Sequence, residues 1–522
     1  TSNLKRLDGY PHIKVVYRGN VSPDKVALIS GGGSGHEPAH AGFVGRGMLS
    51  AAVCGEVFAS PSVDAVLAGI LAVTGDAGCL LIVKNYTGDR LNFGLAAERA
   101  KALGKRVEVV VVADDVALPD ISQPRGVAGT LFVHKIAGYL AEQGETLQMV
   151  ATVAREVAEA ARSYGVALDN CTVPGMEKDE RIAVGMAELG IGIHSEPGVE
   201  TVAFETAQAI SKTIMAALCD GMDKDEQQVL LLNNLGSTTP LEMQVIVDSI
   251  MAGDEGQRIS ALIGPAPLMT SLDMHGFSAS LLPARDAWMT ALLAPVEPAA
   301  WPDILTPGIV NIEPMPEGLV TVAAIASSDN AMRALITDSC AAFIAMEDDL
   351  NLLDAKVGDG DTGATLAQAA RALSDSVDGL PLADTTALLG AISNQLATTM
   401  GGSSGVLLAI LFSAAGDASR VGSNPVVALR AGLGRMMEYG GAELGHRTMV
   451  DALLPALDSL VHGQPIAEAA ALARQGADAT AALTRARSGR SAYVPESALT
   501  GVTDPGAEGV ARYFAMLAAR AS

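Results

Sequence analysis

A proline-dense stretch near the middle of the chain most constrains the folds open to this sequence. From Ala294 the chain reads APVEPAAWPDILTPGIVNIEPMPEG, with repeated prolines and neither helical nor strand periodicity. Proline lacks a backbone donor and has a fixed φ, so such a run continues neither a helix nor the interior of a sheet. This composition is typical of a linker, and 522 residues exceed the size of one hydrophobic core. We therefore expect separate domains joined by a linker over residues 301–327.

The part before the linker alternates strand-like and helix-like segments. Apolar runs of strand length occur in KVALIS and in GCLLIVKNY, and each ends in turn or polar residues. After the second run, LNFGLAAERAKALG has helical spacing, and the valine-rich RVEVVVVADD follows as a buried strand would. Strand, helix, strand indicates a βαβ unit. The pattern recurs at QVLLLNNLG and ALIGPA, so residues 1–300 are predicted to form a two-lobed α/β domain, with lobes of about 1–165 and 166–300.

The part after the linker differs in kind. Residues 328–522 consist of alanine- and leucine-rich amphipathic segments with hardly a strand-like run. The whole chain is 49% hydrophobic but only 4% aromatic, which suits helices rich in small aliphatic residues. This part is predicted to be an all-α domain, a helical barrel or bundle.

Charge and cysteine usage narrow the range of partners. The formal net charge is −24, and nucleic acids and anionic membranes recruit clustered lysine and arginine instead. We therefore expect neither as a partner. No apolar run approaches the ~18 residues that span a bilayer, so no transmembrane segment is expected. The five cysteines form no CxxC pair, which favours a reduced, cytoplasmic protein.

The stretch SGGGSGHEPAH contains an apparent zinc-protease motif, His36-Glu37-x-x-His40. That motif needs a helix that aims both imidazoles at one ion, but Pro38 is tolerated only in a first helical turn. His36 would then lie in the preceding loop, so a zinc site is not expected. A tight turn with Pro38 near a helix start explains the glycines but not the histidine and glutamate at the tip. A small-molecule pocket at the carboxyl end of a strand explains both.

Two more loops of the α/β part carry reactive side chains. VKNYTGDRLNF offers Lys84 and Asp89 after a strand, although helix capping by Thr87 or Asp89 would explain this loop without a ligand. LGIGIHSEPGVE places His194 among glycines and beside Glu196. A lone histidine is usually structural, but one on a glycine-rich loop is a candidate for reactivity.

The helical part contains one acidic loop and two candidate phosphate cradles. LDAKVGDGDTG places Asp354, Asp359 and Asp361 within eight residues, a set of hard oxygen ligands that suits Mg²⁺, with Thr362 as a possible helix cap. An EF-hand is excluded by the residues at its fifth and twelfth positions, and a solvated turn is the alternative. MGGSSGV and GHRTMVDAL are predicted helix starts that suit anions, although small-residue packing would also explain either one.

Together these motifs resemble the dihydroxyacetone kinases, specifically the single-chain ATP-dependent form. SGGGSGHEPAH, LLIVKNYTGDRLNFGLA, GIHSEPG and NNLG are similar to the substrate-binding half of the family. LDAKVGDGDTG, MGGSSG, HRTMVDAL and GRSAYVPESALTGVTDPGA are similar to the nucleotide-binding half. The resemblance covers nearly the whole chain and implies an enzyme of glycerol metabolism that phosphorylates dihydroxyacetone, and glyceraldehyde as well, using ATP.

The resemblance also implies roles for residues. His194 would hold the substrate as a covalent hemiaminal, Asp89 would be the general base, and His36 would lie near it. Gly33, Lys84 and Asp89 would bind the substrate, whereas His40 has no role and is interpreted as structural. Two Mg²⁺ ions would be bound by Asp354, Asp359 and Asp361. The implied nucleotide-binding residues are Gly402, Ser403, Ser404, Arg447, Thr448, Asp504 and Gly506.

Other activities and departures from the family pattern stay open. The resemblance implies a homodimer, and some family members split FAD to AMP and cyclic FMN or act as non-catalytic co-regulators. Ser195 stands where the family usually has glycine, Ser237 replaces another glycine, and His446 replaces a common acidic residue. The region 175–180 is shorter than usual. None of these departures affects a residue expected to carry chemistry.

Overall fold

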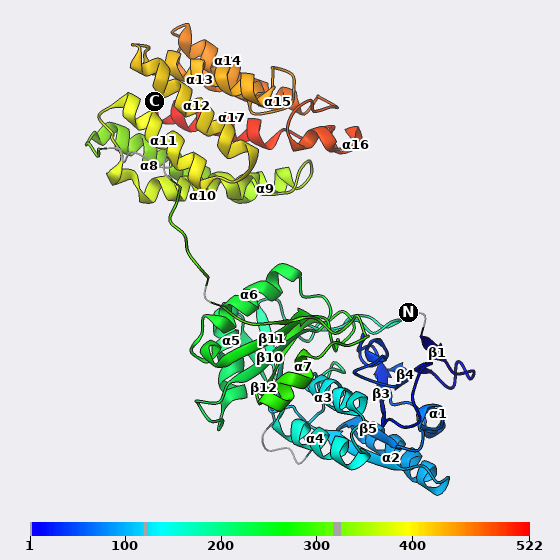
Figure 1. The fold of residues 1–522 in the computed structure, drawn as a ribbon. Coiled ribbons are helices and arrows are strands. Elements are labelled where there is room, and N and C mark those ends of the chain that lie inside the picture. Colours follow the sequence, from blue (N-terminus) through cyan, green and yellow to red (C-terminus); the bar gives the residue numbers. More distant parts are fainter. Residues whose placement is uncertain (1–2, 119–122, 309, 317–324, 522) are drawn as a thin grey trace. The chain divides into compact units, whose positions relative to one another are not determined.

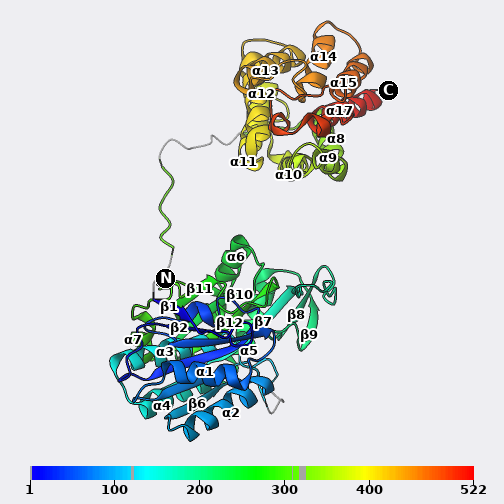
Figure 2. The same cartoon turned by 90° about the vertical axis from the view of Figure 1, so that its right-hand side faces the viewer.

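The computed structural model describes residues 3–118, 123–308, 310–316 and 325–521. The chain divides into two compact units, Thr1–Asn311 and Ile312–Ser522, shown as ribbons in Figures 1 and 2. The first unit contains two sheets with helices, and the second is helical in its described residues. The predicted fold class, a two-lobed α/β domain followed by an all-α domain, is confirmed.

The first sheet has six strands in the order β1-β2-β4-β3-β5-β6. β3 pairs in parallel with β4 and β5, and β5 with β6, whereas β2 runs antiparallel to β1 and β4. The predicted βαβ unit is β5, α2 and β6. The bounds are β1 Leu4–Arg6, β2 Val15–Arg18, β3 Ala27–Ser34, β4 Ala51–Val57, β5 Cys79–Lys84 and β6 Val107–Val112, with α1 Val63–Val73, α2 Thr87–Ala102, α3 Thr130–Gln143 and α4 Leu147–Ala160.

The second sheet has seven strands in the order β13-β11-β10-β12-β7-β8-β9. Only β10 and β11 pair in parallel; the remaining neighbours are antiparallel. The bounds are β7 Arg162–Asp169, β8 Met186–Leu189, β9 Glu200–Ala203, β10 Gln228–Asn234, β11 Ile259–Ala266, β12 His275–Pro283 and β13 Ile304–Leu305, with α5 Ala207–Cys219, α6 Pro240–Met251 and α7 Asp286–Leu293.

Three hydrophobic cores hold the first unit together. One packs the first sheet against α1 and α2, and another packs the second sheet against α5 and α6. The largest contains side chains of both sheets together with α3, α4 and α7, so these helices lie between the sheets. Valine- and leucine-rich strands such as β5, buried along their whole length, are what two covered faces require.

The second unit is built from helices whose ends are set by local sequence. α13, for example, begins after Asn424, whose side chain accepts from the Val427 amide, has Pro425 in its first turn, and ends at Gly441 with φ 65°. The helix bounds are α8 Asn330–Ala345, α9 Glu347–Asp354, α10 Thr362–Asp375, α11 Thr385–Thr399, α12 Gly402–Arg420, α13 Pro425–Gly440, α14 Val450–Val461, α15 Ile466–Thr480, α16 Glu496–Leu499 and α17 Pro505–Ala521.

The helical unit contains an apolar cavity of about 460 Å³ that is partly open to solvent, lined by side chains of α8, α10, α11, α12, α13 and α17 and of the segment Met449–Leu460. Among the described helices, α12 is long and apolar enough to cross a membrane by length and composition. The sequence expectation of no such run therefore does not hold for α12 on these two criteria. α12 packs along α11 and α13, and 28% of its apolar window is buried inside the structure.

Candidate active site

The sequence suggested a turn at Gly31, Gly32 and Gly33, but these residues form the carboxyl end of β3, which pairs in parallel with β4 and β5. Gly32 has φ 152°, and a Cβ there would lie 2.7 Å from the Lys84 amine and 3.5 Å from a carboxylate oxygen of Asp89. A Cβ on Gly33 would lie 2.7 Å from the backbone nitrogen of Ala59. Glycine therefore lets the backbone approach the amine and the carboxylate closely, and this edge of the sheet is where α/β folds place ligands.

The HEPAH segment does not form the helix that a zinc protease needs. After β3 the chain makes a loop, followed only by a short 3₁₀ helix at Ala41–Phe43. The rings of His36 and His40 bond to different partners: His36 Nδ1 to the Thr270 carbonyl at 2.8 Å, and His40 Nε2 to the Lys84 amine at 2.9 Å. The two imidazoles therefore do not share an ion site.

His36 is a neutral hydrogen-bond acceptor facing the interior. Because the Thr270 carbonyl can only accept, His36 Nδ1 carries the proton and Nε2 keeps its lone pair. Burial, followed by the positive charge of Lys84, holds the His36 pKa well below its ordinary value. Its Nε2 and Asp89 Oδ1 are both buried and have no hydrogen-bond partner among the described residues. Such unpaired acceptors are costly unless a ligand donates to them.

His194 lies beside His36 although it comes from the loop between β8 and β9. Its ring centroid is 4.8 Å from that of His36, 4.4 Å from that of Tyr86 and 5.5 Å from that of Phe58, all at steep angles. Burial, followed by the positive charges of Lys84 and Arg125, lowers the His194 pKa to about 3. At neutral pH the ring is therefore uncharged and keeps a nucleophilic nitrogen.

Lys84 begins a hydrogen-bonded chain that continues through His40 and His134. The sequence had given His40 a structural role only. The amine bonds to His40 Nε2 at 2.9 Å, His40 Nδ1 bonds to His134 Nε2 at 3.1 Å, and His134 Nδ1 bonds to the Thr130 carbonyl at 2.9 Å. Since the carbonyl accepts, each ring donates from Nδ1 and accepts at Nε2, so Lys84 is the donor at the other end. All three side chains are buried. No sequence signal pointed to His134, because its ring partner is 94 positions away.

The acidic loop of the helical unit brings its three carboxylates together. One oxygen from each of Asp354, Asp359 and Asp361 lies within 4.8 Å of the others. Asp354, at the end of α9, accepts from the amides of Asp361 and Thr362, so it is oriented by the start of α10. The sequence suggested Thr362 as the cap, but Asp361 occupies the N-cap position and Thr362 is the first helical residue. Clustered carboxylate oxygens fit a hard divalent cation such as Mg²⁺.

The predicted nucleotide-binding residues of the first cradle lie at a helix N-terminus. Gly402, Ser403 and Ser404 form the first turn of α12 and are exposed. Free amide groups and the helix dipole at this position suit an anion.

The remaining predicted residues gather where α14 and α17 begin. Thr448 donates its amide to Asp451, whereas Arg447 is buried and donates to the Val502 carbonyl at 2.8 Å. Asp504 caps α17 through the Ala507 amide, and burial raises its pKa to about 6. A Cβ on Gly506 would lie 3.2 Å from Asp504 and 3.3 Å from Met449. Arg447 and Asp504 are thus interior residues of this cluster, and their role toward a nucleotide stays a prediction.

Comparison with known proteins agrees with the family resemblance in both halves of the chain. A Dak1 domain model matches residues 2–300, and a DAK2 domain model matches residues 356–519. Dihydroxyacetone kinase of Citrobacter freundii is 47% identical, over 99% of this chain and 94% of that protein. The triokinase/FMN cyclase of Homo sapiens is 38% identical, over 97% of this chain and 93% of that protein.

Solved structures of a dihydroxyacetone kinase also match this chain. The native dihydroxyacetone kinase of C. freundii matches with a TM-score of 0.65 at 44% identity, covering 99% of this chain and 95% of that one. The same kinase in complex with AMP-PNP and Mg²⁺ matches with a TM-score of 0.64. A dihydroxyacetone kinase operon co-activator matches over 58% of this chain, with a TM-score of 0.54 at 32% identity.

The fold and the two sites thus define a two-domain protein with a cluster of buried histidines in its α/β unit and an acidic loop in its helical unit. The sequence and structure matches extend across both units. The chain belongs to the dihydroxyacetone kinase family, in the form that has both domains on one chain.

Proposed function

We propose that this protein transfers the terminal phosphate of ATP to dihydroxyacetone, and to glyceraldehyde as well. The observation that carries the proposal is the uncharged His194 ring beside the unpaired Nε2 of His36. This pair offers a nucleophile for a carbonyl carbon and an acceptor for a hydroxyl proton on two rings whose centroids are 4.8 Å apart. The kinases of C. freundii and of Saccharomyces cerevisiae, 47% and 35% identical, support the same reaction.

Substrate capture would use the neutral ring of His194. A ring nitrogen adds to the carbonyl carbon, the C=O π bond breaks, and the ring proton ends on the new hydroxyl, so a neutral hemiaminal results. The rings of His36, Phe58 and Tyr86 pack around the imidazole and limit the space for a bound substrate. Glycerol has no carbonyl to trap, so capture would discriminate ketones and aldehydes from polyols.

Proton removal from the terminal hydroxyl would fall to Asp89. Its Oδ1 is buried without a partner in the described part of the chain, and Oδ2 lies near Gly32. His36 Nε2 would accept from a substrate hydroxyl and orient it. The Lys84 amine, fixed by His40, would donate to a substrate oxygen. Positioned general bases typically contribute 10²- to 10⁴-fold to a rate.

The helical unit would hold the nucleotide. Asp354, Asp359 and Asp361 would bind two Mg²⁺ ions, and bound Mg²⁺ neutralises charge on the phosphates of ATP. The exposed first turn of α12, with Ser403 and Ser404, would contact phosphate oxygens. The solved complex of the C. freundii kinase with AMP-PNP and Mg²⁺ supports this assignment.

We further propose a homodimer in the cytoplasm. The family resemblance supports the dimer. The location is supported by five free cysteines, none in a disulfide. A net charge of −24 supports small-molecule rather than nucleic-acid partners.

The deciding experiment is a coupled phosphorylation assay with ATP and Mg²⁺ across dihydroxyacetone, glyceraldehyde and glycerol. We expect turnover of the first two compounds and none of glycerol. Intact-protein mass spectrometry without ATP should show an adduct of dihydroxyacetone that His194→Ala abolishes. A protein that consumes no ATP with dihydroxyacetone would refute the kinase and favour a ligand sensor, as in the operon co-activator.

A second activity is suggested by the triokinase/FMN cyclases, which are 37% to 38% identical to this chain. We propose testing it by incubating the protein with FAD and Mg²⁺ or Mn²⁺ and separating the products by chromatography. Formation of cyclic FMN that Asp359→Asn removes would establish a cyclase in the helical unit. If no cyclic FMN forms, the proposed cyclase activity is refuted and the proposed kinase reaction is unaffected.

A further inference from the structure

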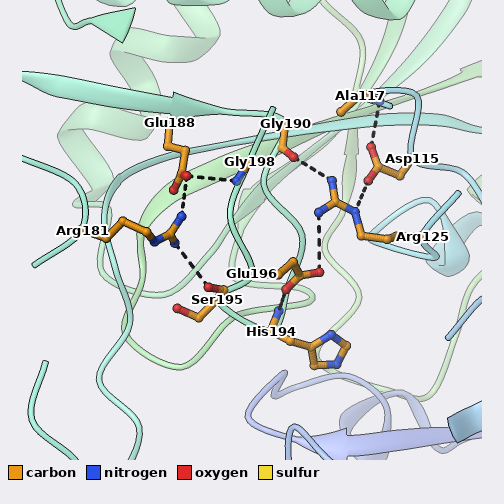
Figure 3. Close-up of polar contacts among 10 residues, drawn as sticks. All are labelled: Asp115, Ala117, Arg125, Arg181, Glu188, Gly190, His194, Ser195, Glu196 and Gly198. Atoms are coloured by element: carbon orange, nitrogen blue, oxygen red, sulfur yellow. Dashed lines mark hydrogen bonds and ion pairs between the residues drawn. The ribbon is translucent and has the colours of Figure 1, made fainter. Parts of the chain in front are cut away.

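The loop that carries His194 is held by hydrogen bonds and ion pairs from Arg125 and Arg181, as Figure 3 shows. This His194 loop, residues 190–198, connects β8 to β9. Three of its carbonyl and amide groups and one of its carboxylates bond to side chains that come from elsewhere in the chain. Connecting loops are usually mobile. Several charged groups fix the backbone of this loop, which indicates that its conformation matters for the residue it carries.

One tie runs through Arg125. Its Nε donates to Asp115 at 2.6 Å, and its Nη2 donates to the Gly190 carbonyl at 2.6 Å. Its Nη1 lies 3.6 Å from Glu196, whose other oxygen accepts from the backbone amide of His194 at 2.8 Å. Arg125 and Asp115 are largely buried, where a charge-assisted hydrogen bond is stronger than in water. The amide of His194 is thereby linked through two ion pairs to the segment after β6.

The other tie runs through Arg181. Its Nη1 pairs with Glu188, which also accepts from the Gly198 amide at 3.0 Å. Its Nη2 donates to Asn170 at 2.8 Å and to the Ser195 carbonyl at 3.3 Å. Arg181 therefore contacts the carbonyl of the residue that directly follows His194.

Ser195 has a backbone conformation that serine disfavours. Its φ is 62°, in the left-handed region where the Cβ of an L-residue crowds the following carbonyl oxygen. Relative to glycine, such a conformation is disfavoured roughly 5- to 30-fold. The Ser195 hydroxyl makes no hydrogen bond with any described residue, so it does not stabilise this conformation. Contacts from other residues must therefore stabilise the left-handed conformation of Ser195.

We propose that Arg181 and Glu196 are positioning residues that hold Ser195 in the left-handed conformation, and so keep the His194 ring beside His36. The role of His194 in capture rests on the proposed function, but the conformational claim does not. Arg181 holds the carbonyl that follows the strained φ, and Glu196 holds the amide of His194. With glycine at position 195 the backbone would adopt φ 62° unaided, and Arg181 would matter less.

A double-mutant cycle tests this coupling. The four proteins are the native chain, Arg181→Gln, Ser195→Gly and the double variant. Arg155→Gln, which removes an ion pair with Glu108 in the same unit, is the matched control. Hydrogen exchange of the 190–198 peptide, corrected for intrinsic rates, is measured without substrate, and dihydroxyacetone adduct formation is measured by mass spectrometry.

We expect Arg181→Gln to speed exchange of the peptide and to lower adduct formation by roughly 5- to 30-fold in the serine background. In the glycine background the same substitution should have at most a few-fold effect, and Arg155→Gln should have none in either readout. Equal effects of Arg181→Gln in both backgrounds would overturn the inference, because a merely structural arginine gives additivity. If the native chain forms no adduct, the covalent step of the proposed function fails, and the exchange data alone decide the inference.

Discussion

The uncharged state of His194 leads to a pH prediction that the structure makes quantitative. The perturbation is a change from pH 8 to pH 5 in the absence of ATP. Burial and the nearby cations lower the pKa of the ring to about 3, so lowering the pH does not protonate it in this range. An exposed histidine with a pKa of about 6.5 would be only about 3% neutral at pH 5, whereas this ring stays about 99% neutral. Capture of dihydroxyacetone by His194 should therefore change little, rather than fall about 30-fold.

Two measurements check this prediction. The binding constant for dihydroxyacetone is measured by calorimetry at pH 5, 6, 7 and 8, with His194→Ala as the control that reports non-covalent binding alone. The imidazole signals of the protein with ¹³C-labelled histidine are followed over the same range, with His194→Gln to assign one of the eight histidines. The direct signal matters because the buried Asp114, with a pKa raised to about 6, titrates in the same window.

The refuting result is a His194 signal that titrates near pH 6.5 together with a binding constant that falls about 30-fold. Either the ring would then be solvated or a carboxylate would stabilise its charged form. In that case capture at neutral pH would depend on the fraction of neutral imidazole, and the burial argument would be wrong.

Three further predictions concern other parts of the two sites. Asp89→Asn should keep the dihydroxyacetone adduct but lower kcat by 10²- to 10⁴-fold, and near-normal turnover would contradict its role as base. Asp359→Asn should weaken Mg²⁺ binding to the free protein at least tenfold in calorimetry; unchanged affinity would move the metal elsewhere. His40→Phe removes the acceptor of the buried Lys84 amine and should lower the free energy of unfolding by about 1.5–3 kcal/mol in urea, whereas the exposed His12→Phe should change it little.

Much of the architecture could be predicted because its signals are local. The strand-length runs became β3, β5 and β6, and the aperiodic proline-rich stretch separates an α/β unit from a helical one. The acidic loop was equally visible, since Asp354, Asp359 and Asp361 lie within one turn between two helices. Local backbone geometry brings neighbours in sequence together whatever the rest of the chain does.

Other features required the three-dimensional arrangement. One alternative interpretation of HEPAH placed a helix start near Pro38, and Thr362 was a possible helix cap; the structure shows a short 3₁₀ helix at Ala41–Phe43 and Asp361 at the N-cap position. Both differences concern helix ends, where a few contacts decide the boundary. Arg125, Arg181 and His134 were not identified at all, because no motif marks a residue whose only role is to hold another one.

The sequence by itself determined the class of each domain, the loops that carry chemistry and the acidic cluster. The tertiary structure alone decided that His194 lies against His36, that His36 Nδ1 bonds to a carbonyl 234 positions away, and that Lys84 donates to His40. The reason is physical. Charge state and nucleophilicity depend on burial and on partners in space, and those are set when the two sheets and the helices between them pack together and bring loops from distant parts of the chain into contact.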